Sequence, residues 1–148
     1  MHEQSFIYMG VPKAQGRARF KNIRTKSGKS INIAYDPKDS AQYKSDLAVQ
    51  ILAQNPKFIP ANVPVILKLV IILPRPKTHY NTKGNIKDSF KDLKHTSKPD
   101  LDNLEKAVKD AMKGIVWHDD SQVYKVDKEK LYTGEQQSPR ALITVVAR

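Results

Sequence analysis

The chain has 148 residues, of which 26 are lysine or arginine and 15 are aspartate or glutamate, so its formal net charge is +11. A chain of this length is expected to form a single domain over residues 1–148 and to bury a hydrophobic core without metals or disulfides. The absence of cysteine excludes disulfide frameworks, thiolate zinc sites and cysteine nucleophiles.

The apolar and polar pattern predicts short strands separated by turn residues. A turn at Ser27-Gly28-Lys29 predicts a hairpin, and the run 63–73 is rich in Val and Ile, as in a buried strand. The predicted strands are residues 6–10, 18–24, 30–35, 63–73, 122–127 and 141–146.

Two helices complete the predicted fold. The first is expected to begin with Asp36 as N-cap and Pro37 as its first residue, and to stop at Asn55-Pro56. The second is expected from Leu101 to Gly114, with an apolar face formed by Leu104, Ala107, Val108 and Ala111. The order of elements predicts an α/β (α+β) fold, a small mixed β-sheet packed with two helices.

Residues 74–97 have no sustained hydrophobic period and are interrupted by prolines and a glycine. Such a segment is long for a loop in a compact domain, so it is expected to be either functional or partly disordered. His79 and His95 are interpreted as additional donors on this loop. His118 is interpreted as a surface histidine, and Trp117 as a core residue.

Positive charge is concentrated in two segments, residues 1–35 with seven basic residues and residues 74–99 with seven more. This charge predicts a polyanionic partner. Nucleic acid is favoured over an acidic membrane because no basic amphipathic helix is present. The candidate DNA-binding residues are Lys13, Arg17, Arg19, Lys21, Arg24, Arg75, Lys77, Lys94 and Lys98.

Acidic residues follow directly after the second basic segment. Carboxylates in such a place repel phosphates unless a cation lies between them. Asp100 and Asp102 are spaced so that both could share one ion, and Asp119-Asp120 follows one helix and a short turn later. Oxygen ligands without cysteine or a spaced histidine pair predict Mg²⁺, with Mn²⁺ as the alternative, and these ions promote phosphodiester hydrolysis.

Structural roles account for several of these acids equally well. Asp102, with Glu105 three residues later, matches a capping box, and Asp119-Asp120 before Ser121 matches a turn. Asp100 is the acid that these structural roles do not require.

The residues from Lys98 to Val123 form a specific motif. It combines D-x-D-N-L at residues 100–104, a lysine at position 106 and W-x-D-D-x-Q at residues 117–122. This 26-residue stretch resembles the RusA-type Holliday junction resolvases, a family frequent in prophages. An early G-R-x-R at residues 16–19 agrees with the resemblance in outline.

The resemblance implies a RusA-like, homodimeric, Mg²⁺-dependent endodeoxyribonuclease that resolves four-way DNA junctions by paired symmetric nicks in recombination and repair. It implies that Asp100, Asp102 and Asp120 bind the metal and act in catalysis. Lys106 would stabilise developing charge or orient the attacking water. Asp119 matches a less clearly assigned additional position. The implied partners are DNA and a second copy of the chain, with no small-molecule cofactor.

Two alternatives stay open at this point. One is a nuclease of the same fold that acts on other branched or flap DNA, and the other is a non-catalytic basic nucleic-acid-binding module. The longest apolar run, residues 63–73, is shorter than the roughly 18–20 residues of a membrane helix. With no signal peptide expected, we predict a cytoplasmic, nucleoid-associated protein without a membrane partner, and a prophage could encode it.

Overall fold

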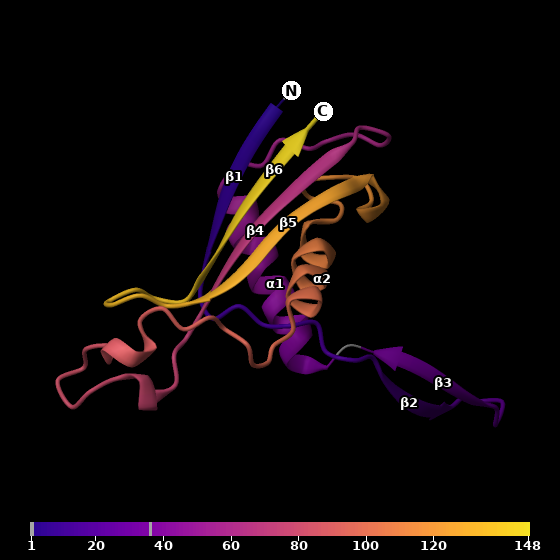
Figure 1. The fold of residues 1–148 in the computed structure, drawn as a ribbon. Helices are drawn as coiled ribbons and strands as arrows, with labels where there is room; N and C mark the ends of the chain where they lie inside the picture. Colours follow the sequence, from indigo (N-terminus) through magenta and orange to yellow (C-terminus); the bar gives the residue numbers. More distant parts are fainter. Residues whose placement is uncertain (1, 36) are drawn as a thin grey trace.

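The computed structural model describes residues 2–35 and 37–148 (Figure 1). In these residues six strands form two sheets and two α-helices accompany them, which confirms the predicted mixed α+β fold. The strands are β1 His2–Met9, β2 Arg19–Arg24, β3 Ser30–Tyr35, β4 Val65–Leu73, β5 Val123–Tyr132 and β6 Arg140–Ala147. The helices are α1 Lys38–Ala53 and α2 Leu101–Met112.

The larger sheet has the strand order β1-β6-β4-β5. Strands β4 and β5 are parallel, whereas the other neighbouring strands are antiparallel. On one face of β4 every residue is buried, and Ile66 and Ile72 are also buried on the other face, where the exposed Lys68 interrupts the apolar sequence. Because parallel neighbours need a crossover, α2 lies between β4 and β5 in the chain, and the turn after α2 leads directly into β5.

Both helices cover the same face of this sheet (Figure 1). From α1, Tyr43, Leu47 and Ile51 are buried, and from α2, Leu104 and Val108. Each fully buried aliphatic side chain of this kind contributes about 1.5–3 kcal/mol to folding. The apolar face predicted for α2 is therefore confirmed. Among the described residues, no helix is long and apolar enough to cross a membrane.

The predicted elements differ from the structure mainly at their ends. Strand β1 begins at His2 because its pairing with β6 continues to Ala147. Strand β5 continues to Tyr132 because it stays paired with β4 as far as Leu73. Pro37 occupies the N-cap position of α1 rather than its first turn, and the predicted N-cap Asp36 lies outside the described residues.

The outer edge of β1 is covered by amide side chains from α1. Gln50 bonds both the backbone N–H and the C=O of Met9, at 2.8 and 2.9 Å. Gln54 does the same for Ile7, at 3.0 and 2.8 Å. These bonds satisfy backbone groups that another strand could otherwise pair with.

Strands β2 and β3 form a separate two-stranded sheet, here called the basic hairpin (residues 19–35), which projects from the body (Figure 1). Gly28 has a φ of +81° in its turn, so the predicted hairpin is confirmed with its predicted glycine. Every side chain of the two strands is exposed. The hydrophobic core therefore does not depend on the hairpin.

Residues 74–97, here called the basic loop, are held by Arg75 rather than disordered. The Arg75 guanidinium donates to the carbonyl oxygens of Thr133 at 2.6 Å and Phe90 at 2.8 Å. It also lies over the ring of Tyr132, 5.3 Å from the ring centroid. The loop forms a second projection, on the opposite side of the body from the basic hairpin (Figure 1).

His79 and His95, interpreted as additional donors on the loop, are instead buried within it. The His79 ring stacks on Phe90 with centroids 4.3 Å apart, and the His95 ring lies 4.3 Å from that of Tyr132. Burial, with a smaller effect of Arg75, lowers the pKa of His79. Burial and the nearby Lys130 ammonium likewise lower the pKa of His95.

We expect the basic loop to loosen as the pH falls from 7.5 to 5.5. An unfolded loop takes up protons near the ordinary histidine pKa of about 6.5, whereas the folded loop keeps both imidazoles neutral to lower pH. Order is therefore fully present above about pH 6.5 and is lost progressively below it. Hydrogen exchange of amides 79–95 measures this, with α2 as the internal control. Constant loop protection down to pH 5.5 would contradict the prediction.

Candidate active site

The N-terminal end of α2 lies between the basic hairpin and the basic loop (Figure 1). Asp100 directly precedes the helix, and Asp102 lies in its first turn. The backbone N–H of Gln15 donates to the carbonyl oxygen of Asn103 at 2.9 Å. This bond ties the segment before the basic hairpin to the acidic end of α2.

Gly16 allows this segment to approach the start of α1 closely. Its N–H donates to Ser40 Oγ at 2.8 Å, and a Cβ at this position would lie 2.8 Å from that oxygen and 2.9 Å from Pro37 Cγ. Arg17 follows and lines one hollow, of about 510 Å³, together with Lys98, Asp100 and Asn103. Gly16, the glycine of the G-R-x-R motif, thus permits the close packing that places Arg17 in the same hollow as Asp100.

Asp100, and not Asp102, occupies the N-cap position of α2, so the capping-box interpretation of Asp102 and Glu105 is wrong. Asp100 has extended backbone angles, follows a cis Lys98–Pro99 peptide bond, and its side chain makes no capping hydrogen bond. Asp102 is exposed within the first helical turn. Neither carboxylate is therefore used to cap the helix.

Asp120 reaches the same side of α2 from the turn that follows the helix. It lines a hollow of about 380 Å³ with Asp102, Lys106 and three further α2 residues, Glu105, Lys109 and Asp110. Asp100 instead lines another hollow with Arg17, and the two hollows share no lining residue. Within residues 2–35 and 37–148, no three acidic or histidine side chains are close enough to hold one ion. Two of the predicted ligands thus line one hollow, but the three are not assembled into one cluster.

The six acids of residues 100–120 fall into two classes. Three are neutralised by lysines, in the pairs Glu105–Lys128 at 3.2 Å, Asp110–Lys44 at 3.7 Å and Asp119–Lys113 at 3.0 Å. In the part of the chain that the structure describes, Asp100, Asp102 and Asp120 form no ion pair. These three supply only hard carboxylate oxygens, a donor set that fits Mg²⁺ or Mn²⁺.

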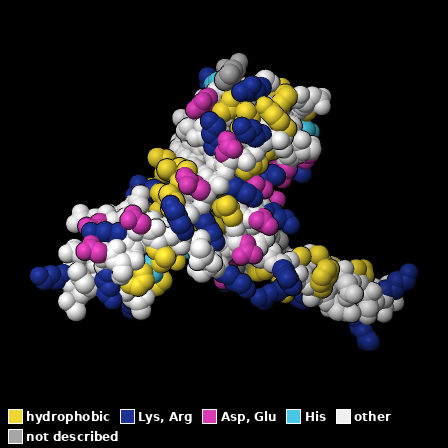
Figure 2. Space-filling model, in the orientation of Figure 1, with side chains coloured by type: hydrophobic (Ala, Val, Ile, Leu, Met, Phe, Trp, Pro, Cys, Tyr) yellow, Lys and Arg dark blue, Asp and Glu magenta, His cyan; other side chains and the backbone are white. Residues whose placement is uncertain are grey.

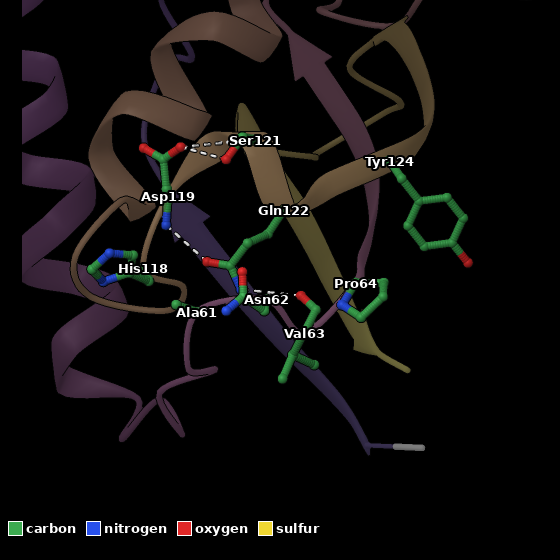
Figure 3. A pocket seen from close by; sticks show the side chains of 9 residues that line it. All are labelled: Ala61, Asn62, Val63, Pro64, His118, Asp119, Ser121, Gln122 and Tyr124. Carbon is green, nitrogen blue, oxygen red and sulfur yellow. Dashed lines mark hydrogen bonds between the residues drawn. The ribbon is translucent and has the colours of Figure 1, made fainter.

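Asp119 builds the turn, as its structural interpretation predicted. Its carboxylate accepts from the backbone N–H and the hydroxyl of Ser121, and its own N–H donates to Gln122 Oε1 at 2.8 Å. The Ser121 bond, together with Lys113, holds the pKa of Asp119 well below its usual range. Figure 3 shows these bonds beside a hollow of about 310 Å³ that His118 and Tyr124 also line; both are exposed.

Comparison with known proteins relates this arrangement to a nuclease family. Residues 10–146 match the family described as Endodeoxyribonuclease RusA. The chain belongs to the RusA family. It is also 36% identical over 131 residues to "Uncharacterized protein YqaN" of Bacillus subtilis (strain 168), covering 88% of each chain. The suspected resemblance is confirmed, and RusA membership favours a nuclease over a non-catalytic module.

As a RusA family nuclease, the protein acts on DNA, and its basic surface suits that substrate. Figure 2 shows Lys and Arg side chains at the ends of both projections, with acidic side chains between them. Eight of the predicted DNA-binding residues are exposed: Lys13, Arg17, Arg19, Lys21, Arg24, Lys77, Lys94 and Lys98. Arg75 is half-buried and holds the basic loop, so we leave it out of the proposed DNA contacts.

Sequence reasoning missed the hydrogen bond that Trp117 makes. The indole is fully buried, as predicted for a core residue, but its Nε1 donates to Asp120 Oδ1 at 2.9 Å. The spacing W-x-x-D was a usable signal, because a tight turn brings such residues together. No sequence signal marked the lysines of α1 and β5 that pair with acids of α2, because these ion pairs depend on how distant elements pack.

Proposed function

We propose that this RusA family protein is a Mg²⁺-dependent endonuclease that resolves four-way DNA junctions by paired nicks. One observation carries the proposal. In the described part of the chain, the acids near α2 that no lysine neutralises are Asp100, Asp102 and Asp120, and they lie where the basic hairpin and the basic loop flank the helix. DNA bound across both projections would place phosphates over these carboxylates.

The residues of the two hollows suggest a division of roles. Asp102 and Asp120 would hold the ion from their shared hollow, with Asp100 contributing from the other one. Bound Mg²⁺, or Mn²⁺ in its place, neutralises phosphate charge and supplies an activated water. Lys106 is exposed and lines the hollow of Asp120 as well as one shared with Arg17. Its ammonium group would stabilise charge on the phosphate or orient the water.

The two projections support a branched substrate. Arg19, Lys21 and Arg24 lie on the basic hairpin and Lys77 and Lys94 on the basic loop, on opposite sides of the carboxylates (Figure 1). The arms of a four-way junction leave its centre in different directions. Both projections could then contact phosphates of different arms while the carboxylates face the branch point.

Paired nicking supports a homodimer as the active form. A junction has approximate two-fold symmetry, and a C2 dimer supplies two equivalent sites. The sheet face opposite the helices would be the surface for the second copy, because no helix covers it (Figure 1). This face has a hollow of about 500 Å³ lined by Val70 and Leu142 together with charged side chains that include Lys68, Asp127 and Glu129. Faces of sheets commonly pack against each other.

The proposal is tested with a four-way junction, a flap and a linear duplex of matched sequence, each with and without Mg²⁺. We expect Mg²⁺-dependent cleavage of the junction and much slower cleavage of the flap and duplex. A plasmid that extrudes a cruciform would become linear rather than a nicked circle, because the nicks are paired. Equal rates on the flap would favour the branched-DNA alternative. No cleavage of any substrate with Mg²⁺ or Mn²⁺ would refute a metal-dependent nuclease.

A further inference from the structure

We infer that Trp117 is a positioning residue that orients the metal-binding carboxylate of Asp120, an inference that rests on the proposed function. Trp117 is the single tryptophan of the chain and is 0% exposed. Its Nε1 donates to Asp120 Oδ1 at 2.9 Å. Among the described residues, the other oxygen of Asp120, Oδ2, has no hydrogen-bond or ion-pair partner. One oxygen is thus fixed and the other is left for a ligand.

The indole cannot turn away from Asp120 without disturbing the core. The backbone of Trp117 bridges those of Ile59 and Lys113, and its carbonyl oxygen accepts from Gly114 N–H at 2.7 Å. The preceding Val116 is also fully buried, and its carbonyl oxygen accepts from Ile59 N–H at 2.7 Å. Close-packed interiors hold such rings in one orientation. Trp117 therefore offers its N–H at a fixed point.

The chain is held equally firmly on the other side of Asp120. Gln122 Nε2 donates to the carbonyl oxygens of Pro60 at 2.7 Å and Val63 at 3.0 Å, while Gln122 Oε1 closes the capping box with Asp119 (Figure 3). The backbone of Asp120 thus lies between two anchored points. Rotation of its side chain is the freedom that remains, and the Trp117 bond restricts it.

A hydrogen bond that orients a metal-binding carboxylate raises the affinity of the site for the metal. Partners that orient a metal ligand from outside the coordination sphere typically contribute about 10–100-fold to affinity. A buried indole N–H needs some acceptor, but a backbone carbonyl would satisfy it equally well. The acceptor here is one of three acids near α2 without a lysine partner, and it shares a hollow with Asp102. The role predicts an effect on metal binding rather than on DNA binding.

The test replaces Trp117 by phenylalanine (Trp117→Phe) in the full chain, which keeps an aromatic ring but removes the donor. We expect the Mg²⁺ concentration for half-maximal junction cleavage to rise about tenfold or more, with the rate at saturating Mg²⁺ changed only a few-fold. Binding of Mn²⁺ without DNA, measured by electron paramagnetic resonance, should weaken by the same factor. Because Trp117 is unique, replacing it biosynthetically with benzothienylalanine provides a second, nearly isosteric variant without the N–H.

A matched control separates orientation from stability. Val116→Ala creates a cavity beside Trp117 but keeps the indole donor, so we expect a lower melting temperature and unchanged Mn²⁺ affinity. Adding Trp117→Phe to Asp120→Asn should weaken Mn²⁺ binding no further than Asp120→Asn alone. In the wild type, Mn²⁺ should quench the fluorescence of Trp117, and Asp120→Asn should abolish this quenching.

The outcomes separate this inference from the proposed function. Unchanged Mn²⁺ affinity in both donor-free proteins, or an equal loss in Val116→Ala, would overturn the role of Trp117. That role is also wrong if Trp117→Phe weakens Mn²⁺ binding by the same factor in the Asp120→Asn protein as in the wild type. If instead Asp120→Asn alone binds metal and cleaves junctions like the wild type, the proposed metal role of Asp120 is itself wrong.

Discussion

Replacing Asp102 by asparagine is expected to slow Mg²⁺-dependent DNA cleavage at least about 10²–10³-fold, the loss typical when one preorganised electrostatic contact is removed from an active site. Asparagine keeps the shape of the side chain but removes the negative charge that a cation needs. Asp102 is exposed and has no lysine partner in the described residues, so its loss leaves no unpaired charge behind. The helix dipole accounts for only about 0.3–1 kcal/mol of stability at this position.

Single-turnover cleavage measures the loss of rate, and a mobility shift in Ca²⁺ or EDTA should show that DNA binding persists. Asp100→Asn should have a comparable effect if the other hollow contributes to the same site. The matched control is Asp46→Asn, because Asp46 is an exposed acid on α1, outside the candidate site and the proposed dimer face, whose carboxylate accepts from Gln42 Nε2 at 2.9 Å. A fully active Asp102→Asn variant would overturn the assignment of the metal ligands.

Neutralising the basic hairpin is expected to weaken DNA binding about 10²–10³-fold at 0.1 M salt. The change is the triple replacement of Arg19, Lys21 and Arg24 by glutamine. Each lost phosphate contact reduces the slope of log K against log salt by about 0.9, so three lost contacts reduce it by about 2.7. The protein should stay folded, because all twelve side chains of β2 and β3 are exposed.

Fluorescence anisotropy across a salt series measures both the affinity and the slope. The control variant combines Lys57→Glu with Arg148→Gln at two exposed positions away from the basic hairpin, which lowers the net charge from +11 to +8, the same change as in the hairpin variant. We expect this control to bind DNA much more tightly than the hairpin variant. Equal weakening in the two proteins would mean that net charge, and not the hairpin, determines affinity.

The parts of the fold that could be predicted are those with a local physical signal. The turn residues Ser27-Gly28-Lys29 predicted the hairpin, and the helical period of Leu104 and Val108 predicted α2 with its buried face. The ends of β1 and β5 were wrong because pairing with neighbouring strands, not local sequence, decides where a strand stops. The burial of His79 was missed because its stacking on Phe90 and its edge-to-face contact with Tyr132 leave no periodic pattern in the sequence.

The sequence predicted part of the arrangement of the candidate site residues. Asp102 and Asp120 do share a hollow, as a helix followed by a short turn suggests. The capping-box interpretation would start α2 after Asp102, whereas the helix begins directly after Asp100. Which acids pair with lysines was beyond prediction, since Lys44 and Lys128 come from α1 and β5.

The glutamine side chains along β1 affect how the protein behaves at high local concentration. A strongly positive chain accumulates on DNA, where the local concentration of molecules far exceeds that in bulk solution. Under such conditions an uncovered strand edge can recruit the edge of a neighbouring molecule and begin a fibril. Because Gln50 and Gln54 already occupy the hydrogen-bonding groups of Met9 and Ile7, molecules packed along DNA would not pair through this part of the edge.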